Sequence, residues 1–524
     1  MSQDTDVRAA DPVLGRLADA ILIPPFRGTT APGWILDALS RGLGGVTLFG
    51  PNIATPGQVS ALTAELRAAV ADDEPVIAID EEGGDVTRVA YNDGSPYPGN
   101  AALGAVDDIA LTQAVHRAIG LDLAALGINF NLAPCADVLG TADSPAVGTR
   151  SFGADTALVS RHTAAAVAGL QSAGVAACTK HFPGHGRTGT DSHHAIATIE
   201  GDLAELRLVD LPPFAAAIRA GTLGIMPSHL RVPELTGDLP ASVSVAAITG
   251  LLRGELGFTG VIVSDALEMR ATRDMFGIPG AAVRAVAAGT DLLCLGRLGD
   301  ESEYGEAEYL AVREALVAAV RDGSLDGARL EEAADRVARL RGGLARARLS
   351  GAVPADPALP DAVGLVAARR AVRASGPRRR LDQPVIIEIE PRENIAAGQF
   401  GWGLGPWARP GSVHRVSSSG RPLNGPSETA VDGDDAVAGI LAAAAGRSLV
   451  VAVRDAHRDQ RTLALIHALL AARPDLVLVE MGLPFWHPPE GTSYLATYGA
   501  SRASAHAAAE LLGLGVTAMP RNDT

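Results

Sequence analysis

Basic residues are scarce in this sequence relative to acidic ones. Its 524 residues include 44 Lys and Arg but 60 Asp and Glu, which gives a formal net charge of -16. Nucleic acids and anionic membranes are bound by clustered Lys and Arg, so this balance argues against either kind of partner. The longest basic run, residues 378–380, follows a proline and is expected to be a solvated connector rather than a binding patch.

Cysteine is also rare, and long apolar segments are missing. The three cysteines, Cys135, Cys178 and Cys294, lie far apart beside apolar runs and have no metal-ligand spacing. An odd count argues against a disulfide framework, so we expect buried reduced thiols. No apolar segment approaches membrane-spanning length, and residues 1–6 lack the basic start and apolar stretch of a secretory signal. We therefore expect a cytoplasmic protein.

The chain is longer than one hydrophobic core usually supports, which predicts two domains. From residue 20 to about 296, short apolar runs alternate with Ala- and Leu-rich amphipathic stretches. Such alternation predicts an α/β fold with a parallel sheet, and eight units predict a closed (β/α)8 (TIM) barrel. An open doubly wound sheet is the alternative, but no Gly-rich phosphate turn follows the first run. The expected strands are 20–24, 44–49, 75–80, 128–134, 175–180, 223–229, 260–265 and 290–295.

A smaller α/β domain is expected after the barrel. Residues 306–348 are predicted to be helical, because Leu330, Ala334, Val337 and Leu340 repeat at helical spacing. The Gly- and Pro-containing segment that follows predicts a linker. The predicted organisation is a catalytic barrel at 1–349, a linker at 350–384 and a C-terminal α/β domain at 385–524, with strands near 385–389, 448–453 and 476–479.

Polar residues stand at the ends of the expected barrel strands. Asp80, Lys180, His229 and Asp265 each close an apolar run. The carboxyl ends of barrel strands carry the active site in this fold, whereas the opposite end mainly contributes stability. Residues 180–193 add three His and an Asp to Lys180 in a loop broken by Pro and Gly, a density of titratable groups that a core segment would not tolerate. The loop predicts an enzyme.

The residue types suit cleavage of a glycosidic bond. A carboxylate such as Asp265 at the mouth of a barrel attacks an anomeric carbon, although Ser-Asp after a strand is also a common helix N-cap. Histidine as a residue type has a pKa near neutrality, which suits His193 to a role as proton donor and acceptor. Asp191, two residues away in the same loop, is placed to bond its other ring nitrogen. A His–Asp pair that only stabilises the loop is the alternative.

A metal site is a further alternative in the same loop. His181, His185, His193 and His194 with Asp191 are ligand types. None has the helical spacing of a zinc hydrolase, and the neighbouring Lys180 opposes a cation. We therefore expect neither a metal nor another cofactor.

Several motifs resemble a known family in both content and order. The signature is KHFPGHG at 180–186, followed after four residues by Asp191-Ser192-His193. With the segments 45–53, 79–84, 148–153 and 264–269, it resembles the bacterial β-N-acetylhexosaminidases of glycoside hydrolase family 3. The resemblance extends over most of the expected barrel.

The resemblance implies a role for each matching residue. Asp265 corresponds to the nucleophile, and His193 to the acid/base catalyst oriented by Asp191. The positions that hold the non-reducing N-acetylglucosamine correspond to Asp80, Arg88, Arg150, Lys180 and His181. The implied activity is that of a retaining exo-β-N-acetylglucosaminidase on small glycosides, with peptidoglycan fragments as the natural source and no cofactor.

Other functions remain open at this stage. A phosphorylase that uses inorganic phosphate as acceptor shares all these residues, since imidazole, unlike a carboxylate base, does not repel phosphate. A β-glucosidase is less favoured, because glucosidases of the family lack the Asp-x-His insertion. A non-catalytic sugar-binding protein is disfavoured by the intact Asp265 and His193. The sequence carries no signal for the oligomeric state.

Overall fold

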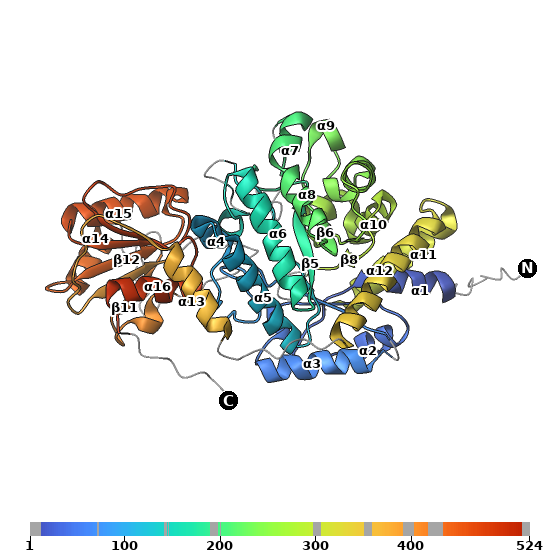
Figure 1. Cartoon of the computed structure of the whole chain (residues 1–524), viewed down its shortest axis with the longest axis horizontal. Helices are drawn as coiled ribbons and strands as arrows, with labels where there is room; N and C mark the ends of the chain where they lie inside the picture. Colours follow the sequence, from blue (N-terminus) through green and yellow to red (C-terminus); the bar gives the residue numbers. More distant parts are fainter. Residues whose placement is uncertain are drawn as a thin grey trace, which may run out of the picture.

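The computed structural model describes residues 12–70, 73–140, 144, 146–188, 197–199, 201–296, 305–349, 359–390, 403–417 and 433–515. The chain forms two α/β bodies side by side, the larger from the N-terminal part and the smaller from the C-terminal part (Figure 1). Each body has its own sheet and its own buried apolar core.

The larger body is a (β/α)8 barrel, as the apolar runs predicted. Its strands β2 to β7 form one ladder in chain order, and β1 pairs with β8 in parallel. A bridge between Val263 and Leu292 joins β7 to β8, and the Thr47 amide donates to the Pro24 carbonyl at 3.3 Å beside β1. The strands are β1 Leu22–Ile23, β2 Gly45–Leu48, β3 Val76–Ile79, β4 Phe130–Asn131, β5 Ala176–Phe182, β6 Gly224–Pro227, β7 Val261–Ile262 and β8 Leu293–Cys294.

The barrel helices cover the outside of these strands (Figure 1). Several begin at a side chain that satisfies an open backbone N–H: Asp108, Asp155 and Asp202 accept from the amide three residues on at 3.1, 2.6 and 2.7 Å. The helices are α1 Pro12–Ala20, α2 Gly33–Ser40, α3 Pro56–Ala68, α4 Asn100–Val106, α5 Ile109–Ala125, α6 Thr156–Ser172, α7 Leu203–Val209, α8 Leu211–Arg219, α9 Pro233–Thr236, α10 Arg270–Ala288, α11 Glu306–Asp322 and α12 Gly327–Leu349, with a π-helical segment at Ala246–Glu255.

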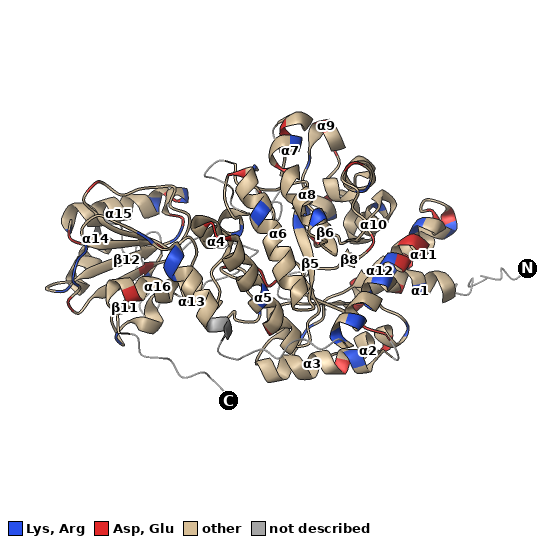
Figure 2. Ribbon diagram, viewed as in Figure 1, with Lys and Arg blue, Asp and Glu red and all other residues tan. Residues whose placement is uncertain are grey.

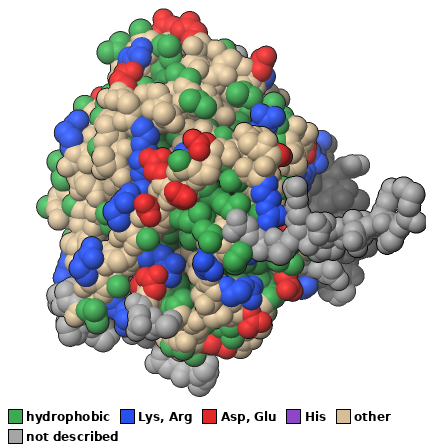
Figure 3. All heavy atoms as spheres, turned by 90° about the vertical axis from the view of Figure 1, so that its right-hand side faces the viewer, with side chains coloured by type: hydrophobic (Ala, Val, Ile, Leu, Met, Phe, Trp, Pro, Cys, Tyr) green, Lys and Arg blue, Asp and Glu red, His purple; other side chains and the backbone are tan. Residues whose placement is uncertain are grey.

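The apolar stripe expected for the last barrel helix is buried. Leu330 and Val337 of α12 are fully inaccessible and belong to the main barrel core. The opposite face of α12 and neighbouring α11 carries charges of both signs (Figure 2). At the end of the molecule that α1 and α11 form, Lys and Arg lie interspersed with Asp and Glu (Figure 3). Such a mixed surface is typical of a solvated face.

Among the described residues, no single helix has the length and apolarity to cross a bilayer. Only the bent pair Pro233–Val243 and Ala246–Glu255, whose halves meet at 97°, passes by length and composition when taken together.

The smaller body is a sheet of order β11-β10-β12-β13-β14-β9, parallel except for β9. Apolar clusters lie on both of its faces. The strands expected near 385–389, 448–453 and 476–479 correspond to β10, β12 and β13. The elements are α13 Leu359–Ala371, β9 Arg373–Ser375, β10 Val385–Ile389, β11 Val413–Val416, α14 Gly433–Ala443, β12 Leu449–Val453, α15 Gln460–Ala472, β13 Val477–Glu480, β14 Ser493–Ala496 and α16 Arg502–Leu512.

Part of the segment expected as a linker is regular structure. Helix α13 packs against α4 and α5 of the barrel and against α16 of the smaller body, so it lies between the two bodies (Figure 1). A Cβ on Gly364 of this helix would lie 2.0 Å from the Pro96 carbonyl oxygen, which shows how close the approach is. Strand β9 then joins the C-terminal sheet. The domain limits themselves stay a prediction.

Candidate active site

The polar residues singled out at strand ends lie at one end of the barrel. Asp80 follows β3, Lys180 and His181 end β5, and Asp265 follows β7. Because these strands are parallel, their carboxyl ends open on the same rim. The side chains therefore face a common region, although they come from distant parts of the chain.

A chain of ion pairs connects most of the predicted binding residues. Lys180 Nζ donates to Asp80 Oδ1 at 2.6 Å and lies 2.9 Å from Glu82 Oε1. Arg150 binds the same glutamate with both ends of its fork, Nε at 2.9 Å and Nη2 at 2.7 Å. Arg88 Nη2 lies 4.0 Å from Asp80 Oδ2. The structure thus brings Arg150 and Lys180 together on Glu82, and Asp80 links Lys180 to Arg88.

Burial and charge act against each other in this network. Burial alone would raise the pKa of Glu82, but the charges of Arg150 and Lys180 outweigh it and hold that pKa well below its ordinary range. Burial would likewise lower the pKa of Lys180, yet Asp80 and Glu82 raise it above its usual value. Glu82, Lys180 and Arg150 therefore stay ionised at neutral pH. They present fixed charges and donors to the barrel mouth, which suits a ligand rich in hydroxyl groups.

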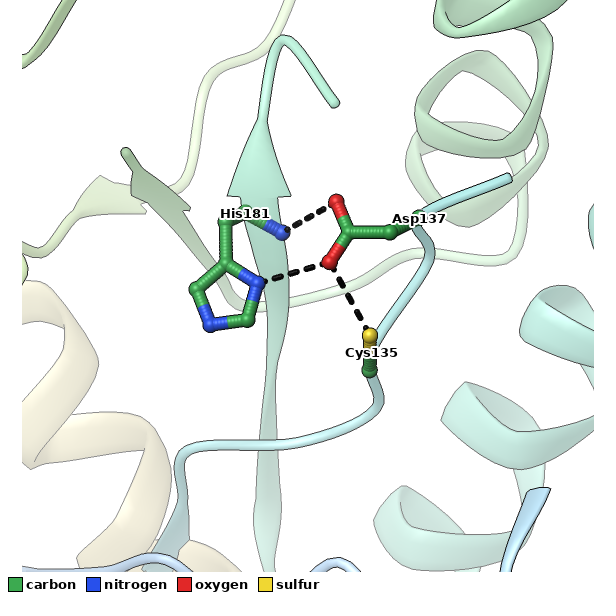
Figure 4. Close-up of side chains that lie close together, drawn as sticks. All are labelled: Cys135, Asp137 and His181. Carbon is green, nitrogen blue, oxygen red and sulfur yellow. Dashed lines mark hydrogen bonds and ion pairs between the residues drawn. The ribbon is translucent and has the colours of Figure 1, made fainter. Parts of the chain in front are cut away.

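His181 is held in one tautomer by groups on either side. Its Nδ1 lies 2.7 Å from Asp137 Oδ2 (Figure 4). On the other side of the ring, Arg150 Nη2 lies 3.2 Å from Nε2. Since the guanidinium only donates, Nε2 accepts and Nδ1–H donates to the carboxylate. Asp137 also accepts the backbone N–H groups of His181 at 3.2 Å and His185 at 2.7 Å. Asp137 therefore sets the path of the chain through 181–185.

Cys135, Asp137 and His181 also form a group of metal-ligand types. One ligand atom from each lies within 4.8 Å of the others, and all three residues are buried. Burial, with the Asp137 charge, raises the pKa of the Cys135 thiol well above its ordinary value, so the thiol donates to Asp137 at 3.0 Å instead of binding as thiolate. The cationic Arg150 beside His181 opposes an ion further. The donor set fits an orienting carboxylate better than a metal centre.

The segment around Asp265 is held by its neighbours. The Ala266 amide donates to Asp265 Oδ1 at 2.8 Å. His229 Nε2 lies 3.0 Å from the Ala266 carbonyl and its Nδ1 lies 2.6 Å from Ser242 Oγ. His229 therefore supports the turn that carries Asp265. The sequence placed His229 at the end of a strand but did not predict this positioning role.

Turn chemistry shapes the loop that follows β3. Gly83 and Gly84 take φ values of +79° and +64°, which side chains rarely adopt, and a Cβ on Gly84 would lie 2.4 Å from Gly99 Cα. The amides of Arg88 and Val89 donate to Glu81 Oε2 at 2.8 and 3.0 Å. This tight loop directs Glu82 into the barrel mouth and returns Arg88 to the same region.

The predicted acid/base pair, Asp191 and His193, lies outside the described residues, as does His194. The loop that leads to it is anchored, because Arg187 binds Asp210 through Nε at 3.0 Å and Nη2 at 2.7 Å. Their roles stay a prediction.

Two residues of the site, Glu82 and Asp137, were not predicted from the sequence. Glu82 follows Glu81 directly, and nothing local indicates which carboxylate faces the barrel mouth. Asp137 stands three residues beyond an expected strand in an otherwise apolar stretch. The rule that singled out Asp80, a charge just after a strand, would have found Asp137 with a slightly wider window.

Comparisons with known proteins agree with this picture. Residues 35–340 match the family model described as the glycosyl hydrolase family 3 N terminal domain. A β-hexosaminidase from Stenotrophomonas maltophilia (strain K279a) is 38% identical over 288 residues, which are 54% of this chain and 85% of that protein. Beta-hexosaminidase A from Pseudoalteromonas piscicida is 33% identical over 338 residues, 60% of this chain. The match spans only 56% of that relative's length.

Solved structures extend the likeness to the second body. The family 3 β-N-acetylglucosaminidase from Paenibacillus sp. str. FPU-7 superposes with a TM-score of 0.82 at 31% identity, over 96% of this chain and 97% of that one. A β-N-acetylhexosaminidase from Beutenbergia cavernae matches 64% of this chain and 99% of its own, with a TM-score of 0.55 at 30% identity.

Proposed function

The chain belongs to glycosyl hydrolase family 3, and on this basis we propose that it is a retaining exo-β-N-acetylglucosaminidase. The observation that carries the proposal is the series of ion pairs that links Asp80, Lys180, Glu82 and Arg150 at the carboxyl ends of the strands. Asp265 lies at the same rim. Relatives named β-hexosaminidase and β-N-acetylglucosaminidase support the substrate class.

The binding residues suit the terminal sugar of a glycoside. A pyranose ring offers several hydroxyl groups and little apolar surface, so it is oriented by charge-assisted hydrogen bonds. Asp80 supplies acceptor oxygens, while Arg88, Arg150 and Lys180 supply donors. His181 adds a ring whose tautomer is set by Asp137. Pre-organised charges of this kind need no reorganisation when a sugar binds.

The proposed reaction has two covalent steps. A carboxylate oxygen of Asp265 attacks the anomeric carbon, the bond from that carbon to the aglycone oxygen breaks, and His193 gives its proton to the leaving oxygen. Water then attacks the same carbon, His193 takes the proton from it, and the ester bond to Asp265 breaks. Two inversions give net retention. Asp191 supports the imidazolium form of His193, which donates the proton in the first step and is restored in the second.

Substrate source and location complete the proposal. We place the enzyme in the cytoplasm, acting on small β-linked N-acetylglucosaminides such as peptidoglycan-derived fragments. The net charge of -16 disfavours anionic polymers as partners.

The test compares two aryl glycosides with and without inorganic phosphate. We expect release of nitrophenol from the 4-nitrophenyl β-N-acetylglucosaminide and not from the matching β-glucoside, with no effect of phosphate. Strong acceleration by phosphate with formation of a sugar 1-phosphate would make the enzyme a phosphorylase instead. No release from either glycoside would refute the proposal.

The nucleophile has a separate test. Asp265→Asn is expected to abolish turnover, and Asp265→Ala with added azide is expected to yield the α-glycosyl azide, because azide occupies the face left by the carboxylate. Asp475→Asn, a change at a half-exposed carboxylate of the second body, is the control that leaves turnover intact. Full activity of Asp265→Asn would remove Asp265 from the mechanism.

A further inference from the structure

A buried ion pair joins the second body to the rim of the barrel. Arg454, the residue after β12, reaches Asp85 Oδ2 with its Nη2 at 2.6 Å. The side chains are only 9% and 2% exposed. The two residues are 369 positions apart in sequence, so the contact exists only because the two bodies are assembled as they are.

Asp85 gathers donors from both bodies. Its Oδ2 also accepts the hydroxyl of Thr149, and its Oδ1 accepts the Ala500 amide at 2.8 Å. Thr149 precedes Arg150, and Asp85 lies between Glu82 and Arg88 in the tight loop after β3. One carboxylate thus ties together the two barrel loops that carry Arg88, Glu82 and Arg150.

Further contacts of the second body fall on the same loops. Arg458 donates to the Ser144 carbonyl, just ahead of the segment Gly148–Arg150. Tyr498 and Leu483 pack with Cys135, Ala146 and Val147 in one apolar cluster. The second body therefore contacts the backbone at Ser144 and the side chains of Ala146 and Val147, close to the segment Gly148–Arg150.

We propose that Arg454 of the C-terminal body is a positioning residue for the sugar site: through Asp85 and Thr149 it holds the two loops that carry Arg88, Glu82 and Arg150. The inference rests on the proposed function for its kinetic test. Asp85 accepts from Arg454, Thr149 and Ala500 at the same time, so removal of the Arg454 side chain leaves this buried carboxylate without its charged partner.

The alternative is that Arg454 only holds the two bodies together, without positioning the sugar-binding loops. The chain offers a matched control for this alternative. Arg370 of α13 pairs with Asp108, the N-cap residue of barrel helix α5, at 2.7 Å. This pair is much more exposed, with 48% of the Arg370 side chain and 32% of the Asp108 side chain accessible. Arg370→Ala breaks an ion pair between the same two bodies and touches neither sugar-binding loop. A residue that only holds the bodies together would behave like Arg370.

The experiment compares Arg454→Met, Arg454→Lys and Arg370→Ala in the full chain. For Arg454→Met we expect KM for the aryl N-acetylglucosaminide to rise by about tenfold while kcat changes much less, because displaced binding groups weaken ground-state and transition-state binding alike. Arg454→Lys keeps the charge and is expected to recover part of the loss. Arg370→Ala is expected to match the wild type in KM.

A double variant guards against misfolding caused by an unpaired buried charge. Asp85→Asn combined with Arg454→Met removes both charges, so the double variant is expected to fold. The amide that replaces the Asp85 carboxylate has only one oxygen and therefore accepts from fewer donors. KM is expected to stay raised. KM within twofold of the wild type in Arg454→Met would overturn the proposal. Equal KM changes in Arg454→Met and Arg370→Ala would do so as well, since they would indicate adhesion alone.

Hydrogen exchange separates this inference from the proposed function. We expect faster exchange of the amides in 81–89 and 147–151 in Arg454→Met than in Arg370→Ala, whether or not the wild type cleaves N-acetylglucosaminides. Failure of the wild type to turn over would refute the function, and unchanged exchange would refute the positioning role.

Discussion

Replacing Glu82 by Gln tests the central feature of the site. Glu82 accepts Arg150 Nε, Arg150 Nη2 and Lys180 Nζ at 2.9, 2.7 and 2.9 Å, and its side chain is 3% exposed. In the glutamine variant one oxygen becomes an NH2 group that faces a cation, and two positive charges lose their shared counter-charge. Breaking such a buried pair costs about 3–5 kcal/mol. We expect the free energy of unfolding to fall by about this amount.

The loss has a defined pH dependence. Because the folded pKa of Glu82 lies below its unfolded value of about 4.3, the charge contributes fully above that value and its contribution is lost as pH falls through the folded pKa. The difference between wild type and Glu82→Gln is therefore expected to be constant from pH 5.5 to 8 and to shrink only in strong acid. Urea unfolding at each pH measures it, and KM for the aryl glycoside is expected to rise in parallel.

The matched control is Glu332→Gln. Glu332 also bridges two arginines, Arg329 at 2.5 Å and Arg336 at 2.6 Å, but it is 49% exposed. Solvent screens such a pair, so its loss is expected to cost about 0–1 kcal/mol. If Glu82→Gln cost no more than Glu332→Gln and left KM unchanged, the view of Glu82 as the organising charge of the site would be wrong.

Other predictions follow from single groups. Asp137→Asn removes the charged acceptor of His181 and His185, and kcat/KM is expected to fall by about 10- to 100-fold; an unchanged value would separate Asp137 from substrate binding. Burial lowers the pKa of His116 to about 4, below its unfolded value of about 6.5, so the unfolded chain takes up the proton first and stability falls as pH drops through this window, by about 3 kcal/mol. His116→Gln is expected to flatten that part of the urea-unfolding pH profile, and an unaltered profile would contradict the assignment. All three cysteines are buried, so native protein at pH 8 is expected to resist a thiol reagent that labels them in urea; rapid labelling of the native state would contradict this.

Much of the fold could be predicted from the local sequence. Parallel strands of a barrel are covered on both sides, so each appears as a short apolar run, and every run expected in 20–295 overlaps a strand. Strand β9 was missed for the complementary reason. Its residues Arg373–Ser375 are all exposed, so they show no apolar signal, and pairing with β14 makes them a strand.

The site residues also divide into those that the sequence predicts and those that only the folded structure identifies. Asp80, Lys180 and Asp265 were found because a charge that directly follows a buried run is visible in the sequence itself. The partners of these residues were not visible: Glu82 and Arg150 are 68 positions apart, and Asp137 and His181 are 44 apart. A local pattern contains no information about which distant loop will supply a counter-charge.

Residue type and spacing by themselves determined the barrel, the rim that carries the polar side chains and the family that this arrangement resembles, because hydrophobic periodicity and motif order are properties of the chain. The tertiary structure decided which carboxylate pairs with which cation, which tautomer His181 adopts and which residues of the second body reach the barrel rim. Those choices depend on distances between segments that meet only after folding, and the energies of buried charges depend on those distances and on the exclusion of water.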